Sequence, residues 1–240
     1  MKQLTFTTLG HSAALDYATK ELKELGWTYQ DNAPIVLLPI PSFDPDGQIK
    51  GGGSIDDLPQ DALIIGGNLA PIKKRKSIDL LQHPLYLSEN AAITAHCAVC
   101  IAMENLPVTL QDCPVFVAGW GRIGKCLVRI LRSLGANVTV AARSESDRAL
   151  AEALGYEVAD ITAGTMNLAK YRVIFNTIPA MVLPEGKLST CQCNCLKIDL
   201  ASLPGIAGSD VIWARGLPNL DAPESSGKLI AKILQKEFSS

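Results

Sequence analysis

A glycine-rich turn near the middle of the chain carries the clearest chemical signal in the sequence. Three glycines follow a G-x-G-x-x-G pattern between an apolar stretch at 115–119 and an amphipathic stretch at 122–134. In that strand–turn–helix setting, such glycines allow a tight turn, let a pyrophosphate approach backbone N–H groups, and let helix and strand pack closely. The pattern predicts a dinucleotide site, and the alternative is a turn that binds nothing. The predicted pyrophosphate turn comprises Gly119, Gly121, Arg122, Ile123 and Gly124.

The end of the next expected strand, 138–142, indicates which dinucleotide is bound. Arg143 and Ser144 follow this strand, Arg148 lies close behind, and no carboxylate precedes Glu145. An acidic residue here would hold the ribose 2′-hydroxyl of NAD, whereas a guanidinium can grip the 2′-phosphate of NADP. The sequence therefore favours NADP, with Arg143 and Ser144 binding it. The alternative is that Arg143 is a solvated residue at a helix start.

Short polar side chains follow further expected strands. The carboxyl ends of parallel strands form the edge at which open α/β sheets bind ligands. We therefore expect the segments at these strand ends to contact cofactor or substrate, with ordinary capping of the strands as the alternative. The cofactor candidates are Asn176, Thr177, Ile178 and Pro179, and the substrate candidates are Asp199 and Ser202. A later loop with Gly216, Leu217 and Pro218 is expected to face the cleft between the two domains and to contact substrate as well.

Histidine and lysine residues supply other candidates for chemistry. His96 could move a proton at neutral pH, although a single histidine on an apolar helix is commonly a core or interface residue. His11 could touch a ligand or cap a helix start. The basic run 73–76 could bind an anion, but it is more typical of a solvated loop.

Strands and helices that alternate along the chain position these residues. The pattern predicts an α/β protein with a parallel sheet and two domains, at 1–89 and 90–240. A polar hinge at 88–90 separates them, and the final helix can pack on the first domain. The expected strands are 4–8, 35–38, 62–65, 115–119, 138–142, 173–176, 196–200 and 211–213, and the expected helices are 13–25, 91–105, 122–134, 145–154 and 225–238.

Composition narrows the class of protein further. The 240 residues include 22 Lys and Arg against 24 Asp and Glu, so a nucleic-acid partner is disfavoured because phosphate binding needs unpaired positive charge. The longest apolar stretch, 91–103, is interrupted by Thr94 and His96, which argues against a membrane span. Seven cysteines without an export signal or a paired ligand pattern predict no disulfide framework and no metal site. We expect a cytoplasmic protein, and the apolar composition is compatible with a homodimer.

Several linked motifs, taken in order, resemble the A subunit of dipicolinate synthase. The similarity covers residues 86–235 and is looser over 1–85, where this chain is shorter than is usual for the family. The matching motifs are the glycine-rich turn and the segments Ala-Arg-Ser at 142–144, Asn-Thr-Ile-Pro at 176–179 and Asp-Leu-Ala-Ser at 199–202. The remaining matches are Asn90, Thr94, Gly135 to Val138, Pro204, Gly205, Gly216 to Pro218, Ala222, Pro223 and Gly227.

The resemblance implies a small flavodoxin-like α/β substrate domain followed by a Rossmann domain that binds NADP. It also implies oxidation of a dihydrodipicolinate-type cyclic dicarboxylate in spore-forming bacteria, a partner that is a flavoprotein-like B subunit, and substrate contacts at Asn90 and Thr94. The chain departs from the family pattern where His96 replaces a glutamate, Ile93 a proline, Asn219 a glycine and Glu224 a lysine.

The sequence is also compatible with other functions. The departures leave room for a regulatory module that binds NADP without turnover, for a dehydrogenase of another small oxo or imino acid, or for a structural partner with a vestigial nucleotide site. A B-subunit gene beside this one would favour the enzyme.

Overall fold

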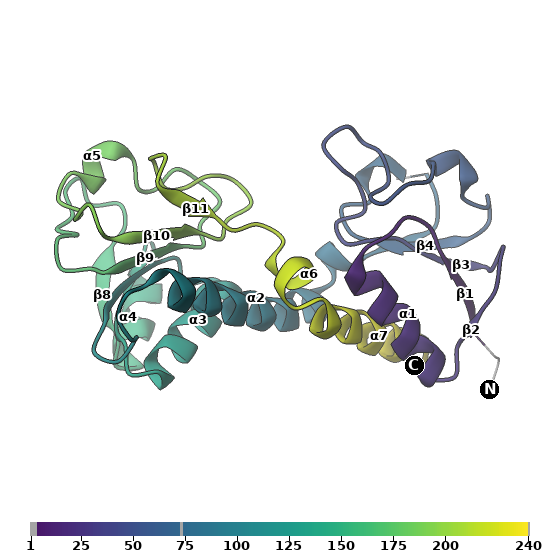
Figure 1. Ribbon diagram of the computed structural model, residues 1–240, viewed down its shortest axis with the longest axis horizontal. Coiled ribbons are helices and arrows are strands. Elements are labelled where there is room, and N and C mark those ends of the chain that lie inside the picture. The colour runs from purple at the N-terminus through teal and green to yellow at the C-terminus, as the bar shows by residue number, and fades with distance from the viewer. Residues whose placement is uncertain (1–3, 73, 240) are drawn as a thin grey trace. The chain divides into compact units, whose positions relative to one another are not determined.

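The computed structural model describes residues 4–72 and 74–239, which form two compact units (Figure 1). The first unit contains Met1–Ile93 and Pro218–Ser240, and the second contains Thr94–Leu217. These units differ from the expected ranges 1–89 and 90–240 in where the last stretch of chain belongs. One residue of the basic run, Lys73, lies outside the described residues.

The first unit is built on a five-stranded parallel sheet with the order β2-β1-β3-β4-β5. This is the strand order of flavodoxin-like folds, so the predicted fold class is confirmed for this part of the chain. The central strand β3 is buried on both faces, as its unbroken apolar run predicted. The strands are β1 (Thr5–Thr8), β2 (Thr28–Tyr29), β3 (Ile35–Leu37), β4 (Leu63–Gly66) and β5 (Ser77–Asp79).

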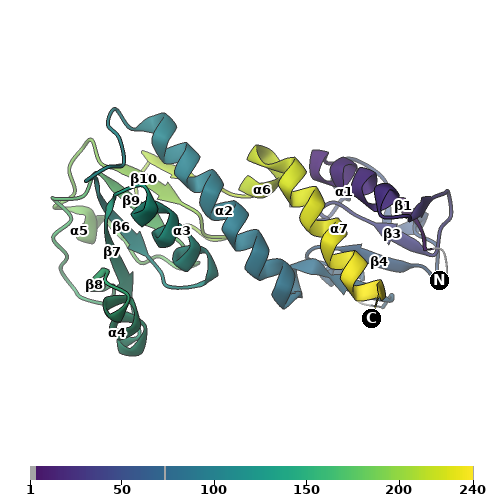
Figure 2. The ribbon, with the colours of Figure 1, turned by 90° about the horizontal axis from the view of Figure 1, so that it is seen from below.

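Two long helices cover the core of this unit side by side, α1 (Ala13–Glu24) and α7 (Pro223–Ser239) (Figure 2). Gly227 lets them approach closely, because a Cβ there would lie 2.6 Å from the carbonyl oxygen of Ala14. The Trp27 indole N–H donates to the Gln235 side chain over 2.9 Å, which ties α7 to the N-terminal core. Three short 3₁₀ helices complete the unit, η1 (Ile55–Asp57), η2 (Ala70–Ile72) and η3 (Leu80–Gln82).

The second unit is built on a six-stranded parallel sheet with the order β11-β10-β9-β6-β7-β8. Counted within the unit, this is the 3-2-1-4-5-6 order of dinucleotide-binding domains, and the predicted Rossmann fold is confirmed. The sheet order reverses at β6, which pairs with β7 on one side and β9 on the other. The strands are β6 (Pro114–Ala118), β7 (Asn137–Ala142), β8 (Glu157–Asp160), β9 (Val173–Asn176), β10 (Leu196–Asp199) and β11 (Val211–Trp213).

The crossovers of this sheet are uneven in length and structure. Helices join β6 to β7 and β7 to β8, whereas the connection at 161–172 contains no helix. Leu168 and Tyr171 of that connection pack with Phe116 and Ile174 of the sheet and bury one of its faces. The helices of this unit are α3 (Arg122–Ser133), α4 (Glu145–Ala153) and α5 (Glu185–Leu188), and α6 (Leu217–Asp221) follows it.

Helix α2 (Pro84–Asn105) corrects one prediction, since the expected polar hinge at 88–90 lies inside it. The polar side chains are accommodated on the helix surface: Ser88 donates to the carbonyl of Pro84, and Glu89 pairs with Lys232 of α7. Among the described residues, α2 alone is long and apolar enough by composition to cross a membrane, and 44% of its apolar window is buried in the structure.

Candidate functional site

The three glycines of the predicted turn each meet a different steric requirement. Gly119 has a φ of +110°, and a Cβ on it would lie 2.2 Å from the Thr177 hydroxyl. A Cβ on Gly124 would lie 2.2 Å from the Gly119 carbonyl oxygen, so only glycine allows α3 to start this close to β6. Gly121, by contrast, has no atom within 4 Å of its ideal Cβ position. The turn is therefore tight on two sides and open at Gly121, the residue expected to face a pyrophosphate.

The start of α3 is left without a side-chain cap. Gly121 is the N-cap residue, and it offers no side chain to accept hydrogen bonds from the first N–H groups of the helix. Those groups carry the positive end of the helix dipole. A phosphate is the kind of ligand that satisfies such a helix start, so the local geometry fits a dinucleotide.

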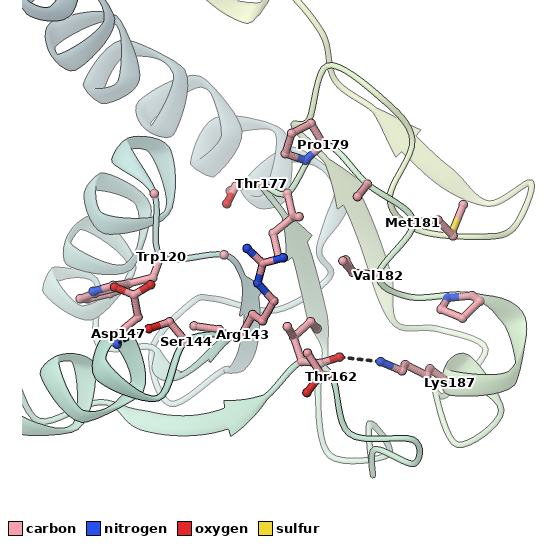
Figure 3. Close-up of a pocket in the computed structure, with 17 residues that line it drawn as sticks. Trp120, Arg143, Ser144, Asp147, Thr162, Thr177, Pro179, Met181, Val182 and Lys187 are labelled. Carbon is pink, nitrogen blue, oxygen red and sulfur yellow. Dashed lines mark hydrogen bonds between the residues drawn. The ribbon is translucent and has the colours of Figure 1, made fainter.

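A pocket of about 660 Å³ opens beside this turn in the second unit (Figure 3). Its walls come from the turn, from the residues after β7 and β8, and from the segment after β9. Two cations, Arg143 and Lys187, and one carboxylate, Asp147, line it, so its charge favours an anionic ligand. The predicted cofactor residues that line it are Gly119, Gly121, Arg143, Ser144, Thr177, Ile178 and Pro179.

The two arginines after β7 have different environments. Arg148 donates to the carbonyls of Ala142 and Arg143 over 2.9 and 2.8 Å, and its guanidinium lies 3.4 Å from the Asp160 carboxylate. The pKa of Asp160 is lowered, chiefly by the Thr162 hydroxyl that donates to it. The Arg143 side chain forms no hydrogen bond or ion pair with any described residue; it is exposed and extends into the pocket (Figure 3). Arg148 thus holds the strand end, and Arg143 is available to a ligand.

Thr177 links the pocket wall to the glycine turn. Its backbone N–H and its hydroxyl both donate to the carbonyl oxygen of Ala118, over 2.8 and 3.0 Å. The end of β9 is therefore fixed to the end of β6, one residue before Gly119. These two hydrogen bonds define the position of the wall against the turn.

Asn176 and Asp199 lie behind the pocket wall and bind each other. They are register partners on β9 and β10, and the Asn176 amide donates to the Asp199 carboxylate over 2.8 Å. Both side chains are buried. Asp199 also accepts the backbone N–H groups of Ala201, Gly205 and Ile206, at 3.1, 2.6 and 3.1 Å. Asn176 was predicted to bind cofactor and Asp199 to bind substrate, whereas in the structure both side chains form hydrogen bonds to other residues of the protein.

This network extends to the wall itself. The Asn176 side-chain N–H also donates to the carbonyl of Ile178 over 2.9 Å, and the Asn176 side-chain oxygen accepts from the Ile178 backbone N–H over 3.0 Å. The Gly205 carbonyl accepts from Val182 and Leu183, over 3.0 and 2.9 Å. Asp199 therefore positions the segment 177–183 at both of its ends.

The other predicted substrate residues are dispersed. Ser202 and Gly216 are exposed, while Leu217 and Pro218 are buried, and none of them lines the pocket. Asn90 is half-buried and Thr94 is buried, at neighbouring positions on one face of α2. Beyond Pro218, the Asn219 amide donates to the carbonyl of Ile40, and its oxygen accepts from Ser226 over 3.1 Å.

His96 lies on α2, where its side chain is exposed. It is two residues from Thr94, which places it on nearly the opposite face of the helix. The structure therefore does not group His96 with the predicted substrate residues of α2, nor with the residues that line the pocket. Of the other candidates, His11 bonds Asp16 over 3.0 Å, and Arg75 donates to backbone carbonyls at 55–59.

Several residues that line the pocket were not predicted from the sequence. Trp120 lies between the first two glycines, is buried, and its indole N–H has no partner among the described residues. Asp147 could have been suspected from its place in the first turn after Ser144. Lys187, whose ammonium donates to the carbonyl of Ile161, gave no signal because it lies far from any motif. Also missed were Ile161, Thr162, Ala180, Met181, Val182 and Pro184.

Comparison with known proteins agrees with the fold and the motifs. No protein-family model matches the chain. The A subunit of dipicolinate synthase from Bacillus subtilis (strain 168) is 29% identical over 197 residues, which cover 76% of this chain and 66% of that protein. The chain thus aligns with slightly less than two thirds of that relative's length.

Solved structures extend the similarity over the whole chain. The A subunit of dipicolinate synthase from Bacillus halodurans superposes with a TM-score of 0.85 at 22% identity, covering 99% of this chain and 98% of that one. D-lactate dehydrogenase from Salmonella has the same fold with a TM-score of 0.65 at 13% identity, covering 99% and 98%. In its ordered motifs and its fold, the chain is similar to the A subunits of dipicolinate synthase.

Proposed function

We propose that this protein is an NADP-dependent oxidoreductase that oxidises a dihydrodipicolinate-type cyclic dicarboxylate. The observation that carries the proposal is the open turn at Gly121, which leads into an uncapped helix start beside a pocket lined by Arg143. The residues fit the cofactor: the first N–H groups of α3 would hold the pyrophosphate, and Arg143 with Ser144 would hold the 2′-phosphate.

The preference for NADP over NAD rests on the free guanidinium of Arg143. Arg148 is engaged by two carbonyls and Asp160, so it does not compete for the phosphate. Asp147 lines the same pocket and would suit a ribose hydroxyl, so the two cofactors must be compared directly. We expect NADPH to bind at least about 10-fold more tightly than NADH in fluorescence titrations. Equal or reversed affinities would contradict the NADP assignment.

The substrate class follows from the family and from simple chemistry. Bound NADP supplies a hydride acceptor; a ring carbon of the substrate loses hydride, the ring loses a proton, and an aromatic pyridine dicarboxylate results. Aromatisation favours the products, so a strong protein acid or base is not required. This agrees with the pocket, whose described lining contains no histidine or cysteine.

A turnover assay tests the activity. Purified protein should reduce NADP, seen as nicotinamide absorbance, when supplied with a dihydrodipicolinate-type substrate, with and without a flavoprotein-like B subunit. Binding of NADPH without any absorbance change across cyclic, imino and hydroxy acids would favour a regulatory module instead. A cytoplasmic location and a B-subunit partner belong to the same proposal, and co-purification with that partner tests the second.

A further inference from the structure

The carboxyl ends of β9, β10 and β11 contain a single cationic side chain. The segments that follow these strands, 176–184, 199–206 and 213–217, include no lysine and only one arginine, Arg215. These strand ends lie on one side of the switch point at β6, and the pocket lined by Arg143 includes the segment after β9 but no residue after β10 or β11. Lys187, the cation that follows the segment after β9, already donates to the carbonyl of Ile161. An anionic group bound at the ends of β10 and β11 would therefore find Arg215 as its cationic partner.

Arg215 is held in place without being neutralised. Its guanidinium carbon lies 4.9 Å from the centre of the Trp213 ring, and it makes no ion pair with any described residue. Stacking on an aromatic ring orients a guanidinium while leaving its N–H groups free for a carboxylate. The side chain is exposed, so a ligand can reach it.

Trp213 is itself anchored to the strand end beside it. Its indole N–H donates over 3.0 Å to the carbonyl of Ala201, in the loop that Asp199 holds. The residue remains 46% exposed, so one part of the indole is accessible to a ligand. A fixed, half-exposed indole that carries a free guanidinium resembles a platform for a flat, negatively charged ligand.

Two other charged groups that the sequence pattern singles out do not serve this purpose. Asp199 accepts hydrogen bonds only from within the protein. Glu224, which lies where the family pattern has a lysine, pairs with Lys228 and repels anions. A dicarboxylate therefore needs a cation other than the one the family pattern supplies.

We propose that Arg215, oriented by Trp213, binds a carboxylate of the substrate and selects dicarboxylic over monocarboxylic rings. This inference rests on the proposed function, because it assigns a substrate contact for that reaction. Arg215 is a binding residue; it neither donates nor removes a proton.

Binding of dipicolinate and of picolinate, its monocarboxylic analogue, to the NADP-saturated full chain tests the inference by calorimetry. Arg215→Ala should weaken dipicolinate binding about 10- to 100-fold and leave picolinate binding nearly unchanged. Arg215→Lys should recover part of the loss, since it restores charge without the planar fork. Trp213→Leu should cost about 2- to 5-fold. The control is Arg129→Ala, which removes an exposed arginine of α3.

The outcomes separate this inference from the proposed function. If NADPH does not bind to the wild-type protein, the proposed function fails. The assignment of Arg215 is wrong if wild type and Arg215→Ala bind NADPH equally and also bind dipicolinate with equal affinity. It is also wrong if both proteins bind NADPH and neither binds dipicolinate. Equal losses for dipicolinate and picolinate would also overturn the claimed selectivity.

Discussion

Both units begin their sheets with a strand, a turn and a helix, yet the two turns treat the helix start differently. In the first unit, the Ser12 side chain caps α1 by accepting from Leu15 N–H over 3.2 Å. The chain itself covers this turn: His11 N–H donates to the carbonyl of Lys50, and a Cβ on Gly10 would lie 2.4 Å from that oxygen. In the second unit, Gly121 leaves the start of α3 uncapped and open.

The difference shows what distinguishes a structural turn from a ligand-binding turn. Glycine is present in both, so its presence alone is uninformative. What matters is whether the chain satisfies the N–H groups at the helix start or leaves them for a ligand. On this criterion, only the turn at 119–124 of these two is prepared for a phosphate.

The largest expected effect comes from closing the open turn with a carboxylate. Gly121→Asp should weaken NADPH binding by about 100-fold or more, because a negative charge would occupy the place of the pyrophosphate. Stability should change little, since no atom lies within 4 Å of the new Cβ. Fluorescence titration and thermal unfolding measure the two quantities.

A matched variant controls for added charge. Gly164→Asp also introduces a carboxylate where nothing lies within 4 Å, in the connection between β8 and β9. It should bind NADPH as the wild type does. Equal NADPH affinity in Gly121→Asp and Gly164→Asp would contradict the comparison of the two turns.

The wall of the open turn should depend on the buried carboxylate behind it. Asp199→Asn should destabilise the protein by about 2–3 kcal/mol, because an amide cannot accept all four hydrogen bonds that Asp199 receives. It should also weaken NADPH binding by moving the segment 177–183. Denaturant unfolding and titration provide the measurements.

An exchange of the pair distinguishes positioning from simple structural damage. The double variant Asn176→Asp with Asp199→Asn restores one amide–carboxylate bond between the register partners. It should regain part of the NADPH affinity that Asp199→Asn alone loses. No coupling between the two substitutions would show that the pair does not act as a unit.

Removal of the free guanidinium should change cofactor preference with little effect on the fold. Arg143→Ala should weaken NADPH binding by about 2 kcal/mol and leave NADH binding nearly unchanged, because only NADPH carries the 2′-phosphate. The ratio of the two dissociation constants measures this. Parallel losses for both cofactors would place Arg143 elsewhere on the nucleotide.

A change in the turn before α1 should affect the stability of the protein and not its affinity for NADPH. Ser12→Ala removes the side-chain cap of α1 and should cost about 1 kcal/mol of unfolding free energy. NADPH affinity should stay at the wild-type value. A loss of NADPH binding in this variant would mean that the first turn, too, contacts the cofactor.

The smallest effect concerns pH and the ion pair between Lys197 and Asp210. Buried Lys197 donates to the exposed carboxylate of Asp210, and this bond lowers the pKa of Asp210. The stabilisation is therefore present above about pH 3.9 and is lost as the pH falls through the lower native pKa. Asp210→Asn should cost about 0.3–1 kcal/mol of unfolding free energy near pH 7, and this difference should shrink as the pH falls through the native pKa of Asp210. Equal unfolding midpoints of variant and wild type at pH 7 would refute this.

Much of the fold could be predicted from the sequence because its strands are apolar on both faces. The strands at 173–176 and 211–213 were predicted with their observed bounds. The short strands β2, β5 and β8 were missed, since two to four residues with exposed or half-buried side chains give no clear pattern. The hinge at 88–90 was wrong because polar residues on a helix surface look like a break in an apolar run.

The candidate site was predictable only where its residues are consecutive. The turn at 119–124 and Arg143 could be predicted because their spacing along the sequence is itself typical of a dinucleotide site. Lys187 and Trp120 reach the same pocket through tertiary packing, which no motif encodes. Asn176 and Asp199 were correctly placed at one edge of the sheet, but sequence could not show that they face each other and bond.

A crystal structure of the protein with NADP bound would test most directly whether the open turn is the cofactor site. We predict the pyrophosphate on the backbone N–H groups at the start of α3, beside Gly121, with the 2′-phosphate at Arg143 and no nucleotide at the turn capped by Ser12. A nucleotide bound elsewhere, or a pyrophosphate at the first turn, would contradict this assignment.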